Sequence, residues 1–322
     1  MQLEIVKYQS HLQKIWDDFI PKTSRGTFLH LRRYLDYHAN RFEDYSLMFF
    51  NGAKLIGVLP AHRKNDQIFS HNGLTYGDFL IDTNIFIDKK IELVKQALLF
   101  LKKKGFKTLD IKTVPEIFHR QTDQSNEFIF NALGGNIQML MPFFAFENSN
   151  YSPNRNRKRS IRKALNFELK FYQNNKLIDD FWILVHQNLK NRYQAQPVHT
   201  IEEIRLLMQR FPEKILLFGL CKEQELSSGA LVYLFDGTLH FQYVHSTLQK
   251  DSRNAVDFLI DQIFSQYQDK YRYFSLGSSQ VAPDQLNKSL VYWKESFGSK
   301  IFNQYFYSFN LQEIDLTNEI LL

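Results

Sequence analysis

The same order of predicted elements occurs twice along the chain, and this repeat limits the fold more than any other feature. The first half has apolar runs at 46–50 and 54–60 around Asn51-Gly52, a strand at 66–71, a helix at 91–104 and a strand at 106–114. The second half has strands at 215–221, 228–235 and 238–246, the last two around Asp236-Gly237, then a helix at 255–267 and a strand at 271–276. Asn-Gly or Asp-Gly between apolar runs is a strong hairpin signal. Because the two sets lie about 170 residues apart, far beyond a solenoid repeat, we predict a duplicated α/β unit.

The length and composition suit two ordinary globular domains. The chain has 322 residues, of which 44% are hydrophobic and 23% charged, a balance typical of folded rather than disordered proteins. We therefore predict an α/β fold of the α+β type. Its two tandem domains would cover residues 1–147 and 148–322, each with a mixed central sheet flanked by helices, and the second would begin with a basic linker helix.

Several classes of protein are excluded by what the sequence lacks. No apolar run approaches the length of a membrane helix, and residues 1–7 do not resemble a signal peptide, so we expect a cytoplasmic protein without a transmembrane segment. The single cysteine, Cys221, rules out a disulfide within the chain and argues against a cysteine-based metal site. A lone cysteine in an apolar run is more often a buried structural residue than a nucleophile.

A strongly basic segment at 155–163 joins the two halves. It carries six cationic side chains, and no acidic residue occurs between Asn148 and Phe167. In a helix that starts at Asn154 or Ser160, arginines at 155, 159 and 162 share one face, and guanidinium groups suit phosphate oxygens. The alternative is the solvated charged face of a linker helix, and the residues alone do not separate the two.

Two other segments could carry chemistry. An isolated lysine, Lys294, lies between Trp293 and Phe297, where a cation could stabilise a developing negative charge. The alternative, which the residues alone favour, is a surface lysine whose stem covers the two aromatic rings. Residues 71–77 combine His71, Tyr76 and two glycines at a strand end.

The strand at 240–246 has alternating polar side chains. Strict alternation places His240, Gln242, Val244 and Ser246 on one face, and Tyr243 and His245 on the other. Either face could line a pocket, although a lone histidine is more often structural. The histidines lack the spacing of a zinc motif, so we expect no metal, and serine-hydrolase, P-loop and dinucleotide-binding motifs are absent.

The repeat, the basic stretch at 154–164 and Trp-Lys-Glu-Ser-Phe-Gly at 293–298 together resemble the tandem-GNAT superfamily. This group includes Fem-type peptidoglycan-bridge aminoacyltransferases and BioF2-like acyltransferases, and the resemblance covers about residues 10 to 310. It implies two GNAT-like domains. It also implies transfer of an acyl group to an amine on a nucleotide-linked or lipid-linked muropeptide, in processes of cell-envelope biogenesis.

The resemblance also implies roles for residues. The family's K-x-x-F-G lysine falls on Lys294, with Phe297 and Gly298 completing the motif, and the family's basic stretch holds phosphate. The catalytic residues that we predict are Lys294, Tyr243 and His245. The substrate-binding residues that we predict are Arg155, Arg157, Arg159, Arg162, Lys163, His71, Tyr76 and Trp293.

The donor stays open, because the sequence departs from both known patterns. The family often has an acidic residue where this chain has Ser275, a difference that bears on an aminoacyl-tRNA donor. An acyl-CoA donor calls for a glycine-rich pyrophosphate loop, and the corresponding segment, 249–255, contains no glycine. We expect no permanently bound cofactor, with acyl-CoA or aminoacyl-tRNA as a donor substrate.

The function predicted from these features is N-acyl transfer to an amine of a cell-envelope precursor, an amino sugar or a muropeptide. Lys294 and backbone N–H groups would stabilise the oxyanion. The basic segment would bind a phosphate-bearing small molecule or lipid-linked substrate, or tRNA. The alternative is a catalytically inactive module that retains the fold to bind an anionic glycan or RNA.

Overall fold

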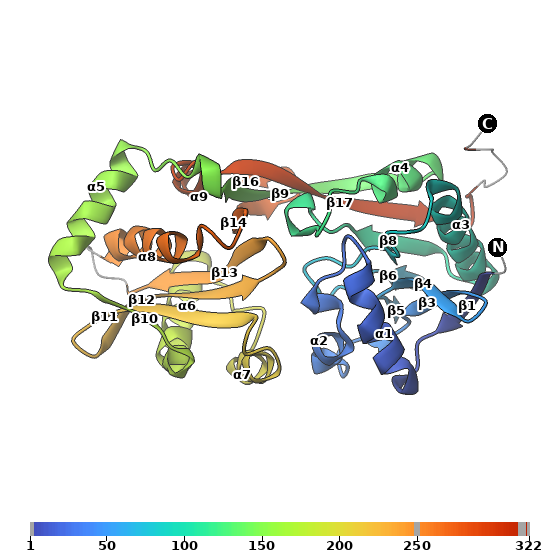
Figure 1. Ribbon diagram of the computed structural model, residues 1–322, viewed down its shortest axis with the longest axis horizontal. Coiled ribbons are helices and arrows are strands. Elements are labelled where there is room, and N and C mark those ends of the chain that lie inside the picture. Colours follow the sequence, from blue (N-terminus) through green and yellow to red (C-terminus); the bar gives the residue numbers. More distant parts are fainter. Residues whose placement is uncertain (1–2, 248–251, 315–319, 321–322) are drawn as a thin grey trace. The chain divides into compact units, whose positions relative to one another are not determined.

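In the computed structural model, the chain forms two compact units (Figure 1). The structure describes residues 3–247, 252–314 and 320. Unit 1 comprises Met1–Met141 and Asn303–Leu322, and unit 2 comprises Pro142–Phe302. The sequence suggested a single boundary after residue 147, with the whole C-terminal part in the second domain. The tertiary contacts instead group the C-terminal segment with unit 1.

Unit 1 contains two sheets and two longer helices. Its first sheet has the strand order β1-β3-β4-β7, and in the second the strands β17, β8, β6, β5 and β2 are neighbours in that order. The strands are β1 (Leu3–Lys7), β2 (Glu43–Asp44), β3 (Leu47–Asn51), β4 (Lys54–Leu59), β5 (His62–Lys64), β6 (Gln67–Phe69), β7 (Leu80–Ile81), β8 (Thr108–Lys112) and the C-terminal half of β17 (Lys300–Asn310). The helices are α1 (Gln13–Phe19), α2 (Arg32–Leu35), α3 (Ile87–Lys103) and α4 (Ser125–Ala132).

Local sequence signals account for much of unit 1. The β3–β4 hairpin turns at Asn51-Gly52, and Gly52 has the positive φ of 59° that such a turn requires. Helix α3 buries the predicted apolar face, including Val94, Leu98 and Leu101, in the core of the unit. The chain leaves this helix at Gly105, whose φ of 85° is typical of a residue that ends a helix.

Unit 2 is built around one mixed sheet. Its strand order is β10-β11-β12-β13-β14-β9, and β13–β14 is the parallel pair among the pairs described. The strands are β9 (Asn136–Glu147), which enters from unit 1, β10 (Lys170–Gln173), β11 (Ile215–Lys222), β12 (Glu225–Leu234), β13 (Thr238–Ser246) and β14 (Tyr273–Ser278), with a small hairpin of β15 (Gln280–Ala282) and β16 (Gln285–Leu286). The helices are α5 (Arg155–Ala164), α6 (Ile178–Tyr193), α7 (Ile201–Arg210), α8 (Ser252–Tyr267) and α9 (Lys288–Glu295).

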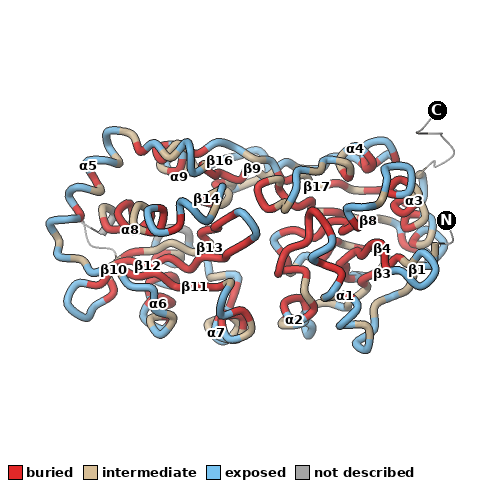
Figure 2. Tube along the Cα trace, in the orientation of Figure 1, coloured by how far each residue is buried: buried red, intermediate tan, exposed pale blue. Residues whose placement is uncertain are grey.

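Helices cover both faces of this sheet. Leu239 and Phe241 of β13 join the core beneath α8, whereas Gly229 of β12 lies against Phe181 of α6 on the opposite face. Figure 2 shows the buried residues concentrated along β11, β12 and β13. The predicted capping box at Thr200 is present at the start of α7. Mixed sheets flanked by helices in both units confirm the predicted fold class.

Candidate functional site

The parallel strands β13 and β14 pair only at their beginnings. Their register covers Thr238–His240 against Tyr273–Ser275, and beyond these residues β13 pairs with β12 while β14 pairs with β9. We call the point where pairing ends, at His240 and Ser275, the strand fork. Where two parallel strands stop pairing inside a sheet, their facing N–H and C=O groups need other hydrogen-bond partners, such as a ligand. The strand fork is therefore a candidate ligand site.

A β-bulge changes which side chains of β13 share a face. Leu231 of β12 opposes Tyr243 and the adjacent Val232 opposes Phe241, so Gln242 is the extra residue. The bulge puts Tyr243 and His245 on the same face as His240, and moves Val244 to the α8 face. The strict alternation predicted from the sequence is therefore wrong beyond Phe241, because one unpaired residue inverts the pattern.

His240 and Ser275 form a buried polar pair at the strand fork. His240 Nδ1 lies 3.0 Å from Ser275 Oγ, and Ser275 is fully buried. Burial, reinforced by the charge of Lys294, lowers the pKa of His240 to about 4. His240 is consequently a neutral imidazole at physiological pH.

Lys294 of α9 points its ammonium group at the end of β14. Its Nζ donates hydrogen bonds to the carbonyl oxygens of Gly277 at 2.9 Å and Ser278 at 2.7 Å, and only 2% of the residue is exposed. The nitrogen also lies 5.4 Å from the centre of the Phe144 ring. No carboxylate of the described residues forms an ion pair with it. The surface-lysine alternative is therefore wrong.

Because Lys294 is buried, its protonation state changes with pH near neutrality. Desolvation alone lowers the pKa of Lys294 to about 7, so ammonium and amine forms both occur at neutral pH. The two carbonyls use two N–H groups, which leaves a third donor in the ammonium form or a lone pair in the amine form. The lysine can therefore donate to an anion or accept a proton.

Two glycines shape the backbone around this lysine. Gly277, whose carbonyl accepts from Lys294, has a φ of 70° and lies at a register shift between β14 and β9. Gly298 has a φ of 95°, and a Cβ there would lie 2.6 Å from the carbonyl oxygen of Asn150. The glycine of the K-x-x-F-G pattern is thus required by backbone conformation and by close approach.

Asp257 of α8 binds the side chains of two predicted substrate-binding residues, Trp293 and Arg157. Its carboxylate, 1% exposed, accepts from Trp293 Nε1 at 2.9 Å and forms an ion pair with Arg157. Both side chains therefore have protein partners that fix α5 and α9 to α8. The other predicted cations of the basic segment, Arg155, Arg159, Arg162 and Lys163, are exposed on α5.

Tyr243 and His245 face α6 and the segment before α7. Tyr243 Oη lies 2.9 Å from His199 Nδ1, and its ring meets Trp182 edge-on at 5.3 Å. Burial raises the pKa of Tyr243 to about 12. The ring of half-buried His245 lies 6.4 Å from that of Phe181. Tyr243 and His245 thus contact α6 and His199, whereas Lys294 contacts β14 and Phe144.

His71 and Tyr76 belong to unit 1, where both are buried. His71 has a φ of 65° and stacks on His38 at 5.0 Å, and Tyr76 packs against Phe118. Burial lowers the pKa of His71 well below its usual value and raises that of Tyr76. The structure therefore places these two predicted substrate-binding residues in the interior of a different unit from Lys294.

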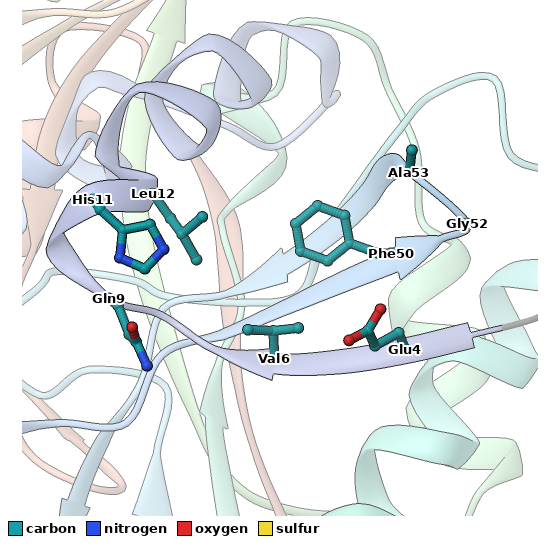
Figure 3. Close-up of a pocket in the computed structure, with 8 residues that line it drawn as sticks. All are labelled: Glu4, Val6, Gln9, His11, Leu12, Phe50, Gly52 and Ala53. Atoms are coloured by element: carbon teal, nitrogen blue, oxygen red, sulfur yellow. The ribbon is translucent and has the colours of Figure 1, made fainter.

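Other features of the chain bear on metals, ligands and membranes. Among the described residues, no group of three His, Cys, Asp or Glu side chains could hold a metal ion. A hollow of about 320 Å³ beside β1 in unit 1 has Leu12 and Phe50 facing each other across it, and none of its lining residues is a predicted site residue (Figure 3). In the glycine-free segment at 249–255, residues 249–251 lie outside the described part of the chain.

No helix in the described ranges is both long and apolar enough to cross a membrane.

Comparison with known proteins supports the fold. No family model and no curated protein sequence matches the chain. The solved structures that match over nearly their whole lengths include three examples. They are FemX (TM-score 0.68, 11% identity, 95% of this chain and 96% of that chain), the C-terminal domain of a putative lysylphosphatidylglycerol synthetase from Agrobacterium fabrum (0.61, 11%, 93% and 92%) and a tandem GNAT protein from the clavulanic acid biosynthesis pathway (0.56, 10%, 98% and 100%). The chain therefore has the tandem GNAT fold that its sequence resemblance implied.

Proposed function

We propose that this protein is an N-acyltransferase that moves an acyl or aminoacyl group to an amine of a cell-envelope precursor, either an amino sugar or a muropeptide. Lys294 carries the proposal: it is buried, lacks a carboxylate partner among the described residues, and is held beside the strand fork by two carbonyls. A buried cation without a counter-ion favours binding of a negative charge. The fold agrees, because the similar structures include FemX and a tandem GNAT protein.

In the proposed reaction, the neutral amine of the acceptor attacks the carbonyl carbon of a thioester or ester. A C–N bond forms, and the carbonyl oxygen becomes an oxyanion to which the third N–H of Lys294 donates. The oxyanion then collapses, the C–S or C–O bond breaks, and the proton lost by the amine neutralises the leaving thiolate or alkoxide. No covalent intermediate on the protein is needed.

Labelled acyl transfer tests this proposal. Acyl-CoA and aminoacyl-tRNA donors would be combined with amino-sugar and muropeptide acceptors, and the labelled amide product measured. Lys294→Met is expected to lower the transfer rate roughly 100- to 1,000-fold, the range for loss of one oxyanion donor. The matched control is Lys288→Met, which removes an exposed lysine from the same helix and is expected to leave the rate unchanged.

The same experiment addresses the inactive binding module. If no donor yields product while an anionic glycan or RNA binds the wild-type protein, the acyltransferase proposal fails and the binding module replaces it. If product forms equally with Lys294→Met, the protein is an enzyme but the assignment of Lys294 is wrong.

A further inference from the structure

Helix α5 presents a row of cations to solvent. Its exposed basic residues are Arg155, Lys158, Arg159, Arg162 and Lys163, which together we call the cationic face. Since successive residues of an α-helix are about 100° apart, these five fall within an arc of about 140° on the helix surface. The opposite side of the helix carries Arg157, Ser160 and Ala164.

Contacts with α8 fix this orientation. Ser160 Oγ donates to Asn254 Oδ1 at 2.7 Å, Arg157 pairs with the buried Asp257, and Ala164 is fully buried in the unit 2 core. The Asn154 side chain caps the helix by accepting from the Arg157 N–H. Helix α5 therefore cannot rotate to bury its cations without breaking these contacts.

The cationic face lacks ion-pair partners in the described part of the chain. No acidic residue occurs between Asn148 and Phe167, and none of its five side chains forms an ion pair in the part of the chain that the structure describes. The five cations are spread along the exposed surface of the helix rather than gathered in a buried pocket. From Arg155 to Lys163 the helix rises about 12 Å, which suits an extended anionic surface.

Exposed apolar and amphipathic side chains lie beside the cations. Leu165, which follows α5 directly, is 62% exposed, and Tyr292 of α9, whose hydroxyl accepts from Asn156 of α5, is 51% exposed. Leucine and tyrosine next to a basic helical face are typical of the lipid headgroup region. Sequence-independent RNA binding instead uses several stacked aromatic rings, and the ring of nearby Tyr151 is packed against Phe264 at 3.8 Å.

We propose that the cationic face of α5 docks the protein peripherally on an anionic lipid bilayer. Clusters of four to eight lysines and arginines on an amphipathic helix are typical of such binding. This role goes beyond acyl transfer and does not depend on Lys294. It would place the protein at a surface that carries lipid-linked anionic molecules.

Vesicle co-sedimentation at low salt tests the docking surface. The wild-type protein is expected to bind vesicles of phosphatidylcholine mixed with phosphatidylglycerol, and not vesicles of phosphatidylcholine alone. The triple variant Arg155→Gln, Arg159→Gln, Arg162→Gln is expected to lower the partition coefficient roughly 100-fold, because each cation near an anionic surface contributes about fivefold. The matched triple variant Lys102→Gln, Lys103→Gln, Lys104→Gln removes the same charge from the exposed end of α3 and is expected to bind like wild type.

Three results would overturn the proposal: no binding to anionic vesicles, an equal loss in the α3 variant, or binding of single-stranded RNA that depends on the three arginines while vesicles are ignored. Circular dichroism and thermal melting establish that both triple variants are folded. The vesicle result is independent of any transfer assay, so failure of acyl transfer and failure of membrane docking are separate outcomes.

Discussion

Acidification from pH 6.5 to pH 4 is expected to reduce the free energy of unfolding steeply. The cause is a set of buried histidines that are neutral in the folded protein. Burial lowers the pKa to about 4 for His62, His119 and His240, to about 3 for His30, and well below 6.5 for His71. Four of these five lie in unit 1, so that unit is expected to respond most strongly.

The packing in unit 1 shows why protonation is unfavourable. His71 stacks on His38 at 5.0 Å and meets His62 edge-on at 5.5 Å. Protonation of more than one of these three rings would therefore place like charges close together. The charge of Lys112 also opposes protonation of His62 and His71. Burial lowers the pKa of Lys112 itself to about 8, so this lysine is cationic throughout the acid range.

The sign of the effect follows from proton uptake. Below pH 6.5 the unfolded chain binds protons at these histidines, and the folded protein does not until the pH nears 4. Stability is therefore fully present above pH 6.5 and is lost as the pH falls through this window. Each such histidine contributes a slope of about 1.4 kcal/mol per pH unit, and several acting together give a correspondingly steeper fall.

Urea unfolding across this pH window measures the effect. A variant with Trp182 and Trp293 changed to Phe retains Trp16, a fully buried reporter of unit 1. We expect its unfolding midpoint to fall with pH, and His62→Gln to make the fall shallower. His11→Gln, at an exposed position, is the matched control and is expected to change nothing. A midpoint that stays constant over the window would contradict the role given to these histidines.

Asp78→Ala is expected to lower the free energy of unfolding by about 3 kcal/mol, because it leaves buried N–H donors without an acceptor and leaves Arg25 with Glu127 as its remaining carboxylate partner. Asp78 is fully buried, with one oxygen 2.8 Å from Arg25 Nη1 and the other accepting from Asn126 Nδ2 at 2.7 Å. It also accepts from the N–H groups of Val114 and Phe79. Its φ of 76° adds strain for alanine, because aspartate and asparagine tolerate this conformation better.

Chemical denaturation of three variants separates these contributions. Asp78→Asn retains an acceptor and the tolerated backbone conformation, and is expected to lose less stability than Asp78→Ala. Asp66→Ala removes a carboxylate that pairs with Lys107 at the surface, and is expected to cost less than about 1 kcal/mol. Equal losses for Asp78→Ala and Asp66→Ala would show that the buried network contributes no more than a surface pair.

Elements set by local signals could be predicted from the sequence, and those set by distant pairing could not. Asn51-Gly52 and Asp236-Gly237 form the predicted turns, and the helix predicted at 91–104 is observed as Ile87–Lys103. The Gln242 bulge has no local signature, since it arises from the register with β12. Likewise, β17 joins unit 1 through pairing with β8, nearly two hundred residues earlier in the chain.

For the candidate site too, local motifs identified some residues, whereas their surroundings depend on distant parts of the chain. The motif identified Lys294, but its burial depends on β14 carbonyls and on Phe144, which adjoin it only in the folded chain. The basic segment was recognisable as a whole, whereas the inward turn of Arg157 depends on Asp257, far along the sequence. The His240–Ser275 pair could have been suspected only from the parallel register of β13 and β14.

The pH dependence of transfer in wild type and Lys294→Met tests the central claim most directly. The acceptor amine titrates equally in both proteins, so the ratio of their rates isolates Lys294. Its pKa near 7 means that the ammonium donor is present below this pH and is lost above it. We predict a ratio that is large at low pH and falls as the pH rises through 7. A ratio of one at every pH, or one that rises with pH, would contradict the assignment of Lys294 as the oxyanion donor.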